Sequence, residues 1–96
     1  MATFNHAVLF TKEDCAPCLN TKGYIHENVP DDLKHHLSIF QKENHTALVT
    51  AYNLELYPTL LIVDKGGREL DRIVGGKKVQ ACINQFLTEI DNARRV

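Results

Sequence analysis

Residues 7–18 read Ala-Val-Leu-Phe-Thr-Lys-Glu-Asp-Cys-Ala-Pro-Cys, an apolar run followed by polar residues and then by two cysteines. The first four residues form a continuous apolar run, which predicts a strand buried on both faces. The next four residues, 11–14, are polar and are expected to form a turn. The two cysteines that follow are separated by two residues, a spacing that lets their sulfur atoms meet within one helical turn and suits reversible disulfide formation.

A helix is expected after the turn, because Cys18, Ile25 and Val29 have the spacing of one helical face. Pro17 fits the first turn of such a helix, where the missing backbone N–H is not needed. Glycine at position 23 weakens the helix by up to about 1 kcal/mol relative to alanine. Pro30 and the two aspartates after it mark the end of the helix or a new turn.

Three more strands are expected, over residues 37–40, 59–63 and 69–74. Asp-Lys-Gly-Gly at 64–67 is a strong turn signal, so the last two strands should form an antiparallel hairpin. The order βαβαββα predicts an α/β fold with a four-stranded mixed sheet and helices on both faces. Residues 1–96 are expected to form one domain, since the chain shows no linker or repeat.

Two further helices complete this pattern, one over residues 44–52 and one from Lys77 onward, with fraying expected over 92–96. The shorter helix should bury one side, formed by Ala47, Leu48 and Ala51. The terminal helix should bury Val79, Ile83, Phe86 and Ile90, and leave Lys77, Gln80, Asn84 and Glu89 to solvent.

Composition narrows the classes of partner. Eleven Lys and Arg against twelve Asp and Glu give a net charge of −1, which argues against a nucleic-acid or anionic-membrane partner. The N-terminus does not resemble a signal peptide, and no apolar run is long enough to span a bilayer. We therefore expect a soluble cytoplasmic protein, monomeric, in which an odd cysteine count disfavours a structural disulfide framework.

The two close cysteines are expected to have different roles, one as the nucleophile and the other as the resolving thiol. Cys15 should lie at the N-terminus of the first helix, where backbone N–H groups and the helix dipole stabilise a thiolate. Cys18, one turn inside the helix, should be shielded and should act as the resolving thiol that releases the product from a mixed disulfide.

At this point the chain resembles the thioredoxin and glutaredoxin superfamily, and in particular its small hybrid redoxins, some of them phage-encoded. Three segments carry the resemblance: Lys12 followed by Cys15-Ala16-Pro17-Cys18, Tyr57-Pro58-Thr59 before an apolar strand, and Gly75-Gly76 after the last strand. The resemblance implies the thioredoxin fold, a cis peptide bond before Pro58, and a Tyr57 backbone that pairs with a bound polypeptide or glutathione. It implies substrate contacts from Lys12, Ala16, Pro17, Tyr57, Pro58, Gly75 and Gly76.

The same resemblance implies a dithiol–disulfide oxidoreductase that reduces protein disulfides, with electron donation to ribonucleotide reductase as one role of such proteins. It implies no bound cofactor, and either a thioredoxin-reductase-like enzyme or glutathione, as co-substrate, for the electron donor. The chain departs from both branches, because Asp14 replaces the usual thioredoxin tryptophan and Leu9 aligns with the buried aspartate. Lys77-Lys78 stands where glutaredoxins carry an acidic residue.

Other interpretations remain open from the residues alone. Cys15 and Cys18 with two of the five histidines could form a structural zinc site. The fold could serve as a binding module whose cysteines do not turn over. Lys12 could stabilise the Cys15 thiolate, bind a carboxylate of glutathione, or be an ordinary solvated loop lysine. The histidines at 35–36 are expected at a strand edge or on the surface. Cys82 is expected to be a small buried hydrophobe.

Overall fold

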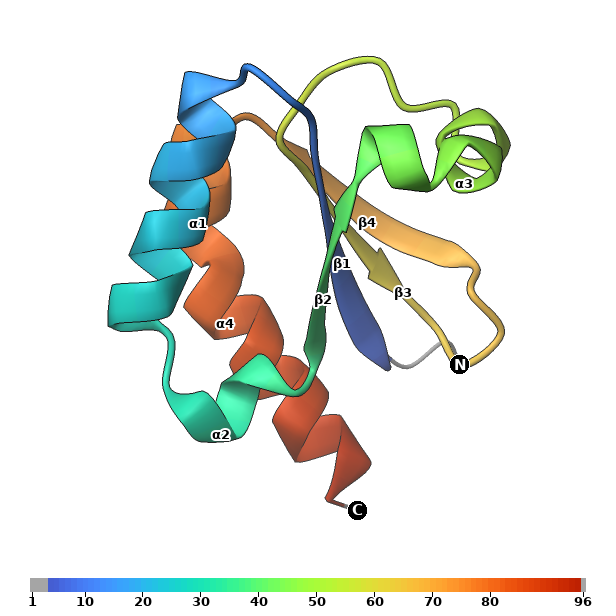
Figure 1. Cartoon of the computed structure of the whole chain (residues 1–96). Helices are drawn as coiled ribbons and strands as arrows, with labels where there is room; N and C mark the ends of the chain where they lie inside the picture. The colour runs from blue at the N-terminus through green and yellow to red at the C-terminus, as the bar shows by residue number, and fades with distance from the viewer. Residues whose placement is uncertain (1–3, 96) are drawn as a thin grey trace.

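The computed structural model describes residues 4–95, which form a four-stranded mixed sheet in the order β2-β1-β3-β4. Strand β2 runs parallel to β1, whereas β3 is antiparallel to both β1 and β4 (Figure 1). The expected mixed sheet and C-terminal hairpin are therefore confirmed. The strands are β1 (His6–Thr11), β2 (Leu37–Gln41), β3 (Thr59–Val63) and β4 (Glu69–Val74).

Helices cover both faces of the sheet, as expected. Helices α1 and α4 pack against each other on one face with the short α2 at their far end, and α3 lies on the opposite side (Figure 1). Among the residues described, no helix combines the length and the apolar character needed to cross a bilayer. The helical segments are α1 (Ala16–Asn28), α2 (Asp31–Lys34), the 3-10 turn η1 (Lys42–Asn44), α3 (Thr46–Ala51) and α4 (Gly76–Arg94).

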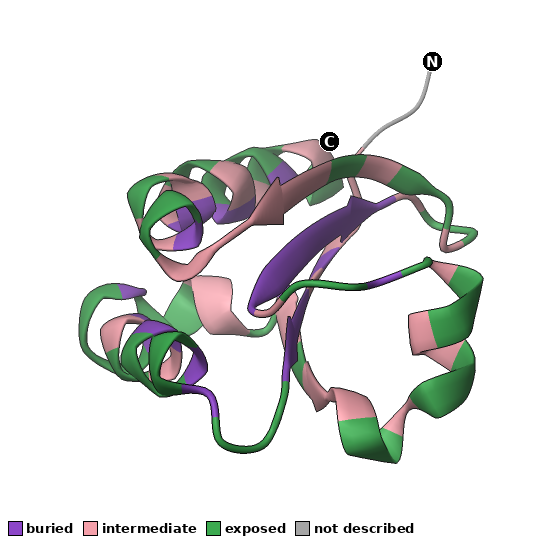
Figure 2. Cartoon of the chain, turned by 90° about the horizontal axis from the view of Figure 1, so that it is seen from above, coloured by how far each residue is buried: buried purple, intermediate pink, exposed green. Residues whose placement is uncertain are grey.

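The apolar residues form two clusters, one on each face of the two central strands. All five residues of β3 are buried, and successive side chains point to opposite faces. Figure 2 shows the buried residues concentrated in the middle of the sheet and on the inward sides of the helices. The larger cluster lies under α1 and α4 and contains Leu9, Leu60, Ile62, Val79, Ile83 and Leu87; the smaller lies under α3 and contains Phe10, Leu54, Leu61 and Val63.

The buried face of α3 differs from the one expected. Ala47 and Ala51 are exposed, and the residues that pack against the smaller cluster are Leu48, Val49 and Tyr52. The helix is shorter than expected, because η1 accounts for the residues before it. In a helix this short, the side with the longest apolar side chains packs against the sheet. The two alanines lie on the other side and are exposed to solvent.

Helix α4 is longer and packs differently from the expectation. Residues 92–94 are helical, so the expected fraying is wrong for them, and Val96 lies outside the described residues. Leu87 is fully buried, whereas Phe86 is only partly buried and packs against the edge of the core. Gln80 and Asn84 are half-buried, not free in solvent.

A polar network fixes the end of α4 to the start of β2. His36 Nε2 lies 2.9 Å from Asp91 Oδ1, Arg94 Nη1 lies 3.2 Å from His36 Nδ1, and Arg95 Nε donates to Asp91 Oδ2 at 2.7 Å. His35 is exposed, but His36 is only 3% exposed, so the expected surface pair is wrong for His36. Burial of this imidazole is tolerated because both of its ring nitrogens have hydrogen-bond partners.

This end of the molecule should lose stability in acid. Burial lowers the pKa of His6, and the charges of Arg94 and His36 lower it further, from an ordinary value of 6.5. The hydrogen bond from His36, then that from Arg95, lowers the pKa of Asp91 from its ordinary 3.8. A depressed pKa contributes stability that is present above the unfolded-state value and is lost as the pH falls through the folded-state value. The His6 contribution therefore declines below about pH 6.5, and that of Asp91 below about 3.8.

We predict that His6→Gln, which retains a donor near Ser38 Oγ, reduces the fall in the free energy of unfolding between about pH 7.5 and 5.0. His6 Nε2 and Ser38 Oγ are 2.8 Å apart in the native protein. Urea denaturation at each pH measures the effect, and His26→Gln, at an exposed position of α1, is the matched control. An equal fall in all three proteins would contradict the assignment to His6.

Candidate active site

The two close cysteines lie at the junction between the end of β1 and the start of α1, and they form a disulfide with a Cα–Cα distance of 5.2 Å. Cys15 is the N-cap of α1, with extended backbone angles (φ −127°, ψ 100°), and its sulfur accepts a hydrogen bond from the Cys18 backbone N–H at 3.2 Å. Pro17 lies in the first turn, as expected. The helix therefore begins at the residue that carries the candidate nucleophile.

Accessibility differs between the two sulfurs. Cys18 is 1% exposed, Cys15 is 6% exposed, and Ala16 and Pro17 between them are exposed. A partner that approaches this corner meets the Ala16-Pro17 backbone and the Cys15 side first. The geometry favours Cys15 as the attacking atom and Cys18 as the shielded one.

Two distant segments meet the cysteine pair. The Tyr57 carbonyl oxygen lies 4.0 Å from Cys15 Sγ, and the Tyr57–Pro58 peptide bond is cis. The Gly75 backbone N–H donates to the Pro58 carbonyl at 2.9 Å, which joins the end of β4 to the start of β3. The structure thus brings Cys15, Pro58 and Gly75 into one site, although the first and the last are sixty positions apart in the sequence.

The glycine pair is required by geometry at both positions. Gly75 has φ 103°, a conformation that other residues rarely adopt. At Gly76 a Cβ atom would lie 2.9 Å from Thr21 Oγ1 and 3.3 Å from the Pro17 carbonyl oxygen. The start of α4 can therefore pack against the first turns of α1 only if position 76 has no side chain.

Tyr57 contributes its backbone to the site, while its side chain points elsewhere. The ring packs against the cluster under α3, with Lys42 Nζ 5.3 Å from its centroid, and its buried hydroxyl has no hydrogen-bond partner among the described residues. Burial raises the pKa of the Tyr57 phenol, and the charge of Glu43 raises it further. The side chain therefore belongs to the interior on the α3 side.

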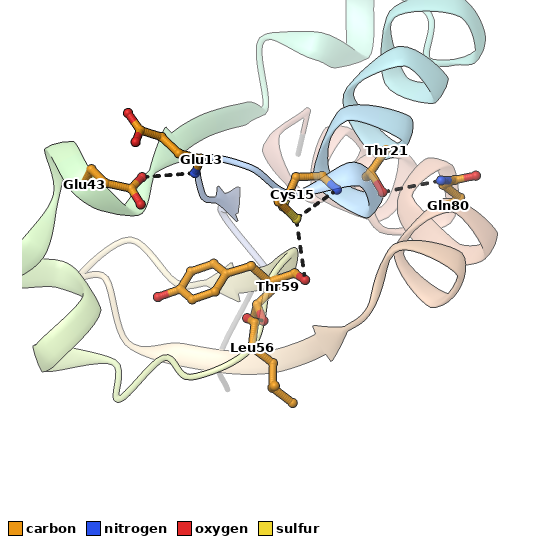
Figure 3. Close-up of a disulfide and its surroundings, with 9 residues drawn as sticks. Glu13, Cys15, Thr21, Glu43, Leu56, Thr59 and Gln80 are labelled. Carbon is orange, nitrogen blue, oxygen red and sulfur yellow. Dashed lines mark hydrogen bonds between the residues drawn. A yellow bond between two sulfur atoms is a disulfide. The ribbon is translucent and has the colours of Figure 1, made fainter.

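The loop before Cys15 is tied to the other side of the site. The Glu13 backbone N–H donates to Glu43 Oε1 at 3.3 Å (Figure 3). Gln41 Nε2 also donates to Glu13 Oε1, at 3.4 Å. Lys12 is exposed and forms no ion pair or side-chain hydrogen bond among residues 4–95. Its position three residues before Cys15 is as predicted, but the structure gives it no contact with the sulfur.

A groove of about 430 Å³ lies beside Pro17, between the first turns of α1 and α4. Thr21, fully buried one turn after Cys18, accepts a hydrogen bond at 3.4 Å from Nε2 of Gln80, a residue that lines this groove (Figure 3). Sequence reasoning missed Asn20, Thr21 and Gln80, because polar residues in helices give no signal of which gap they face. It also missed Val74, because an apolar residue at the end of a strand gives no signal that it lines a groove. The groove is lined by Pro17, Asn20, Val74, Gly75, Gly76, Lys77, Lys78 and Gln80.

The zinc interpretation has no geometric support. In the described part of the chain, the group of side chains close enough to share a metal ion is His35, His36 and Asp91, and it does not include either cysteine of the disulfide. Arg94 and Arg95 also bond to members of that group and fill its binding directions with donors. The histidines are therefore not brought to Cys15 and Cys18.

The third cysteine is not the buried hydrophobe that its pattern indicates. Cys82 is partly exposed, and its thiol lies 3.1 Å from the Lys78 carbonyl oxygen one turn earlier. Its position on α4 falls at the border of the buried face, next to fully buried Ile83. Partial burial raises the pKa of the Cys82 thiol, and the charge of Asp71 raises it further, so little thiolate forms at neutral pH.

Comparison with known proteins gives structural likenesses only. No protein-family model matches the sequence. No curated protein matches it either. The fold is similar to thioredoxin from Trypanosoma brucei brucei, with a TM-score of 0.69 and 18% identity over 96% of this chain and 80% of that one. It is similar to the germline-specific thioredoxin Deadhead of Drosophila melanogaster, with a TM-score of 0.68 and 12% identity over 94% and 99% of the two chains.

Thioredoxin from Plasmodium falciparum is similar to the same degree, with a TM-score of 0.67 and 20% identity over 86% of this chain and 82% of that one. The likeness therefore extends over most of both chains in each case. At these identities it shows the fold, which is the one that the three sequence segments predicted.

The close packing at Gly76 gives a direct test. We predict that Gly76→Ala lowers the free energy of unfolding by about 1–3 kcal/mol, because the added methyl group overpacks the contact with Thr21 and the Pro17 carbonyl. Gly23→Ala is the matched control, since nothing lies within 4 Å of a Cβ at this helical position. The control should gain about 0.5–1 kcal/mol. Chemical denaturation measures both, and a Gly76→Ala protein as stable as the native one would contradict the contact.

Proposed function

We propose that this chain, which has the thioredoxin fold, is a dithiol–disulfide oxidoreductase that reduces protein disulfides through Cys15 and Cys18. The observation that carries the proposal is the position of the Cys15 sulfur. It caps α1, where it accepts the Cys18 N–H, and it lies 4.0 Å from the Tyr57 carbonyl beside the cis peptide bond. A sulfur in this position lies beside a backbone acceptor, and Ala16 and Pro17, which follow it, are exposed.

The reaction follows in two exchanges. The Cys15 thiolate attacks one sulfur of a substrate disulfide, so that a Cys15–substrate bond forms and the substrate S–S bond breaks. The departing sulfur leaves as a thiolate and takes a proton from solvent. The Cys18 thiol then loses its proton and attacks Cys15 Sγ, which releases the second substrate sulfur and forms the Cys15–Cys18 disulfide. Two electrons pass from the protein dithiol to the substrate disulfide.

The start of α1 supports the first exchange. The helix dipole and the unpaired N–H groups of the first turn stabilise negative charge at the N-cap, which lowers the pKa of a thiol there. The Cys18 N–H that bonds to Cys15 Sγ at 3.2 Å is one of these groups. The fold therefore supplies thiolate stabilisation from backbone alone, with no contact from Lys12 required.

The proposal also concerns which molecule donates electrons to this protein and which protein accepts them. A thioredoxin-reductase-like enzyme or glutathione would return the disulfide to the dithiol, and ribonucleotide reductase is a candidate acceptor in a cytoplasm that keeps thiols reduced. The reduction potential distinguishes the donors, because about −270 mV suits thioredoxin-like exchange and about −200 to −230 mV suits glutaredoxin-like exchange. Equilibration with a glutathione redox buffer measures it.

Cysteine variants test the mechanism. We predict that Cys15→Ser lowers disulfide reductase activity to below about 1% of wild type, because an alcohol replaces the nucleophile. Serine is a favoured N-cap residue, so the helix should be retained and the loss should report chemistry rather than unfolding. Cys18→Ser should accumulate a mixed disulfide at Cys15, seen as an added mass that dithiothreitol removes.

The control is Cys82→Ser, which changes the third cysteine and should keep the activity, since the raised pKa of its thiol disfavours attack. Activity that survives in Cys15→Ser would overturn the mechanism. A binding module would instead be established by two results together. The Cys15→Ala/Cys18→Ala protein would bind its partner as well as the native protein does, and the native protein would show no turnover.

A further inference from the structure

The groove beside the cysteine pair carries positive charge, and no acidic residue lines it to neutralise that charge. Lys77 and Lys78 are both exposed, and none of the residues that line the groove is acidic. Among residues 4–95, no ion pair involves either lysine. Both ammonium groups are therefore free to meet a ligand's charge.

The backbone that lines the groove also contributes a positive electrostatic potential. Helix α4 begins at Gly76, and no side chain caps its N-terminus. Its first N–H groups are unpaired donors at the positive end of a 19-residue helix. The two lysines thus extend a field that the helix already directs toward this groove.

The lining of the groove is partly apolar, and through Pro17 it adjoins the cysteine pair in the chain. Pro17 stands between Cys15 and Cys18 in the chain, and Val74 and the glycine pair also line the groove. A polypeptide that presents a disulfide to Cys15 can therefore lay its neighbouring residues here. The amides of Asn20 and Gln80 also line the groove.

Charge on the other side of the site is of opposite sign. Glu13 and Glu43 lie across Cys15 from Thr21 and Gln80, as Figure 3 shows, and exposed Asp14 directly precedes the cysteine. Lys12 and Lys42 adjoin these carboxylates in the chain, so this side carries both signs with an excess of negative charge, whereas the charged residues that line the groove are lysines only. The site is therefore electrostatically asymmetric, which would fix the orientation of a charged substrate.

We propose that this groove binds acidic residues next to the disulfide of a protein substrate, and that Lys77 and Lys78 determine this specificity. The inference rests on the proposed oxidoreductase function and specifies its substrate class. Because both lysines are exposed, each ion pair contributes modestly and is screened by salt. Together they should give a preference of about three- to tenfold at low ionic strength.

The test is a single-turnover reaction between the pre-reduced protein and three peptides that contain the same disulfide loop. The peptides differ only in the residues that flank the loop: Glu-Glu, Gln-Gln or Lys-Lys on each side. Acid quenching and chromatography of the peptide dithiol give second-order rate constants without any natural electron donor. The native protein should reduce the Glu peptide about three- to tenfold faster than the Lys peptide in dilute buffer, and the ratio should shrink in about 0.3 M salt.

Charge reversal locates the effect. In Lys77→Glu/Lys78→Glu the ratio of the two rate constants should fall to about one or invert. The ratio is the readout, because nearby charges also alter thiolate formation and thus the absolute rates. The matched control is Lys65→Glu/Arg68→Glu, which makes the same change in net charge with two exposed cations beyond the far end of β3, and it should keep the native ratio.

The outcomes separate this inference from the function beneath it. Equal rates for the Glu and Lys peptides, with rapid reduction of the Gln peptide, would overturn the inference and leave the oxidoreductase intact. No reduction of any peptide would overturn the proposed function. If charge reversal slows the reaction with oxidised glutathione but leaves the peptide ratio unchanged, the groove serves glutathione and the proposal for a protein substrate is wrong.

Discussion

The hydrogen bond from the Cys18 backbone N–H to the Cys15 sulfur sets the geometry on which the candidate site depends. It makes one atom both the cap of α1 and the candidate nucleophile, so the helix cannot begin elsewhere without moving the reactive sulfur. The cap is possible because β1 ends at Thr11 and a short loop turns the chain sharply before Cys15. Burial of β1 between β2 and β3 fixes where that loop starts, and thus where the sulfur lies.

Strand register brings the remaining parts of the site to the same corner. Phe10, near the end of β1, pairs with Thr59 at the start of β3, and Thr59 pairs with Val74 at the end of β4. The residues just outside these positions are therefore neighbours: the loop to Cys15, the Tyr57–Pro58 segment, and the glycine pair. A one-residue slip in either pairing would turn apolar side chains to the wrong faces of a sheet whose central strand is buried throughout. Core packing thus enforces the site geometry at a distance.

The parts of the fold that follow from local pattern could be predicted from the sequence, and the parts that depend on contacts across the molecule could not. Apolar runs located the strands, and Asp64 with the glycines after it located the hairpin, because its carboxylate accepts the Gly66 and Arg68 backbone N–H groups. In contrast, the last turn of α4 persists because Asp91 meets His36, a residue 55 positions away. The pattern of residues within α4 alone cannot predict that contact. The same holds for Thr21 and Gln80, whose pairing appears only once α1 and α4 are packed together.

The polar groups at one end of the sheet are paired with one another, whereas several of those at the cysteine end are not, and this difference leaves the cysteine end available for the proposed chemistry. At the far end, His36, Asp91, Arg94 and Arg95 satisfy one another, and the network holds α4 in place. At the cysteine end, α4 has no side-chain cap, Lys77 and Lys78 have no partner in the described structure, and the Tyr57 carbonyl faces a sulfur. Unsatisfied groups cost less at an exposed corner than in the interior, because water can solvate them until a ligand replaces it. The fold can therefore keep these groups available for binding because its stability comes from the buried strands and the network at the other end.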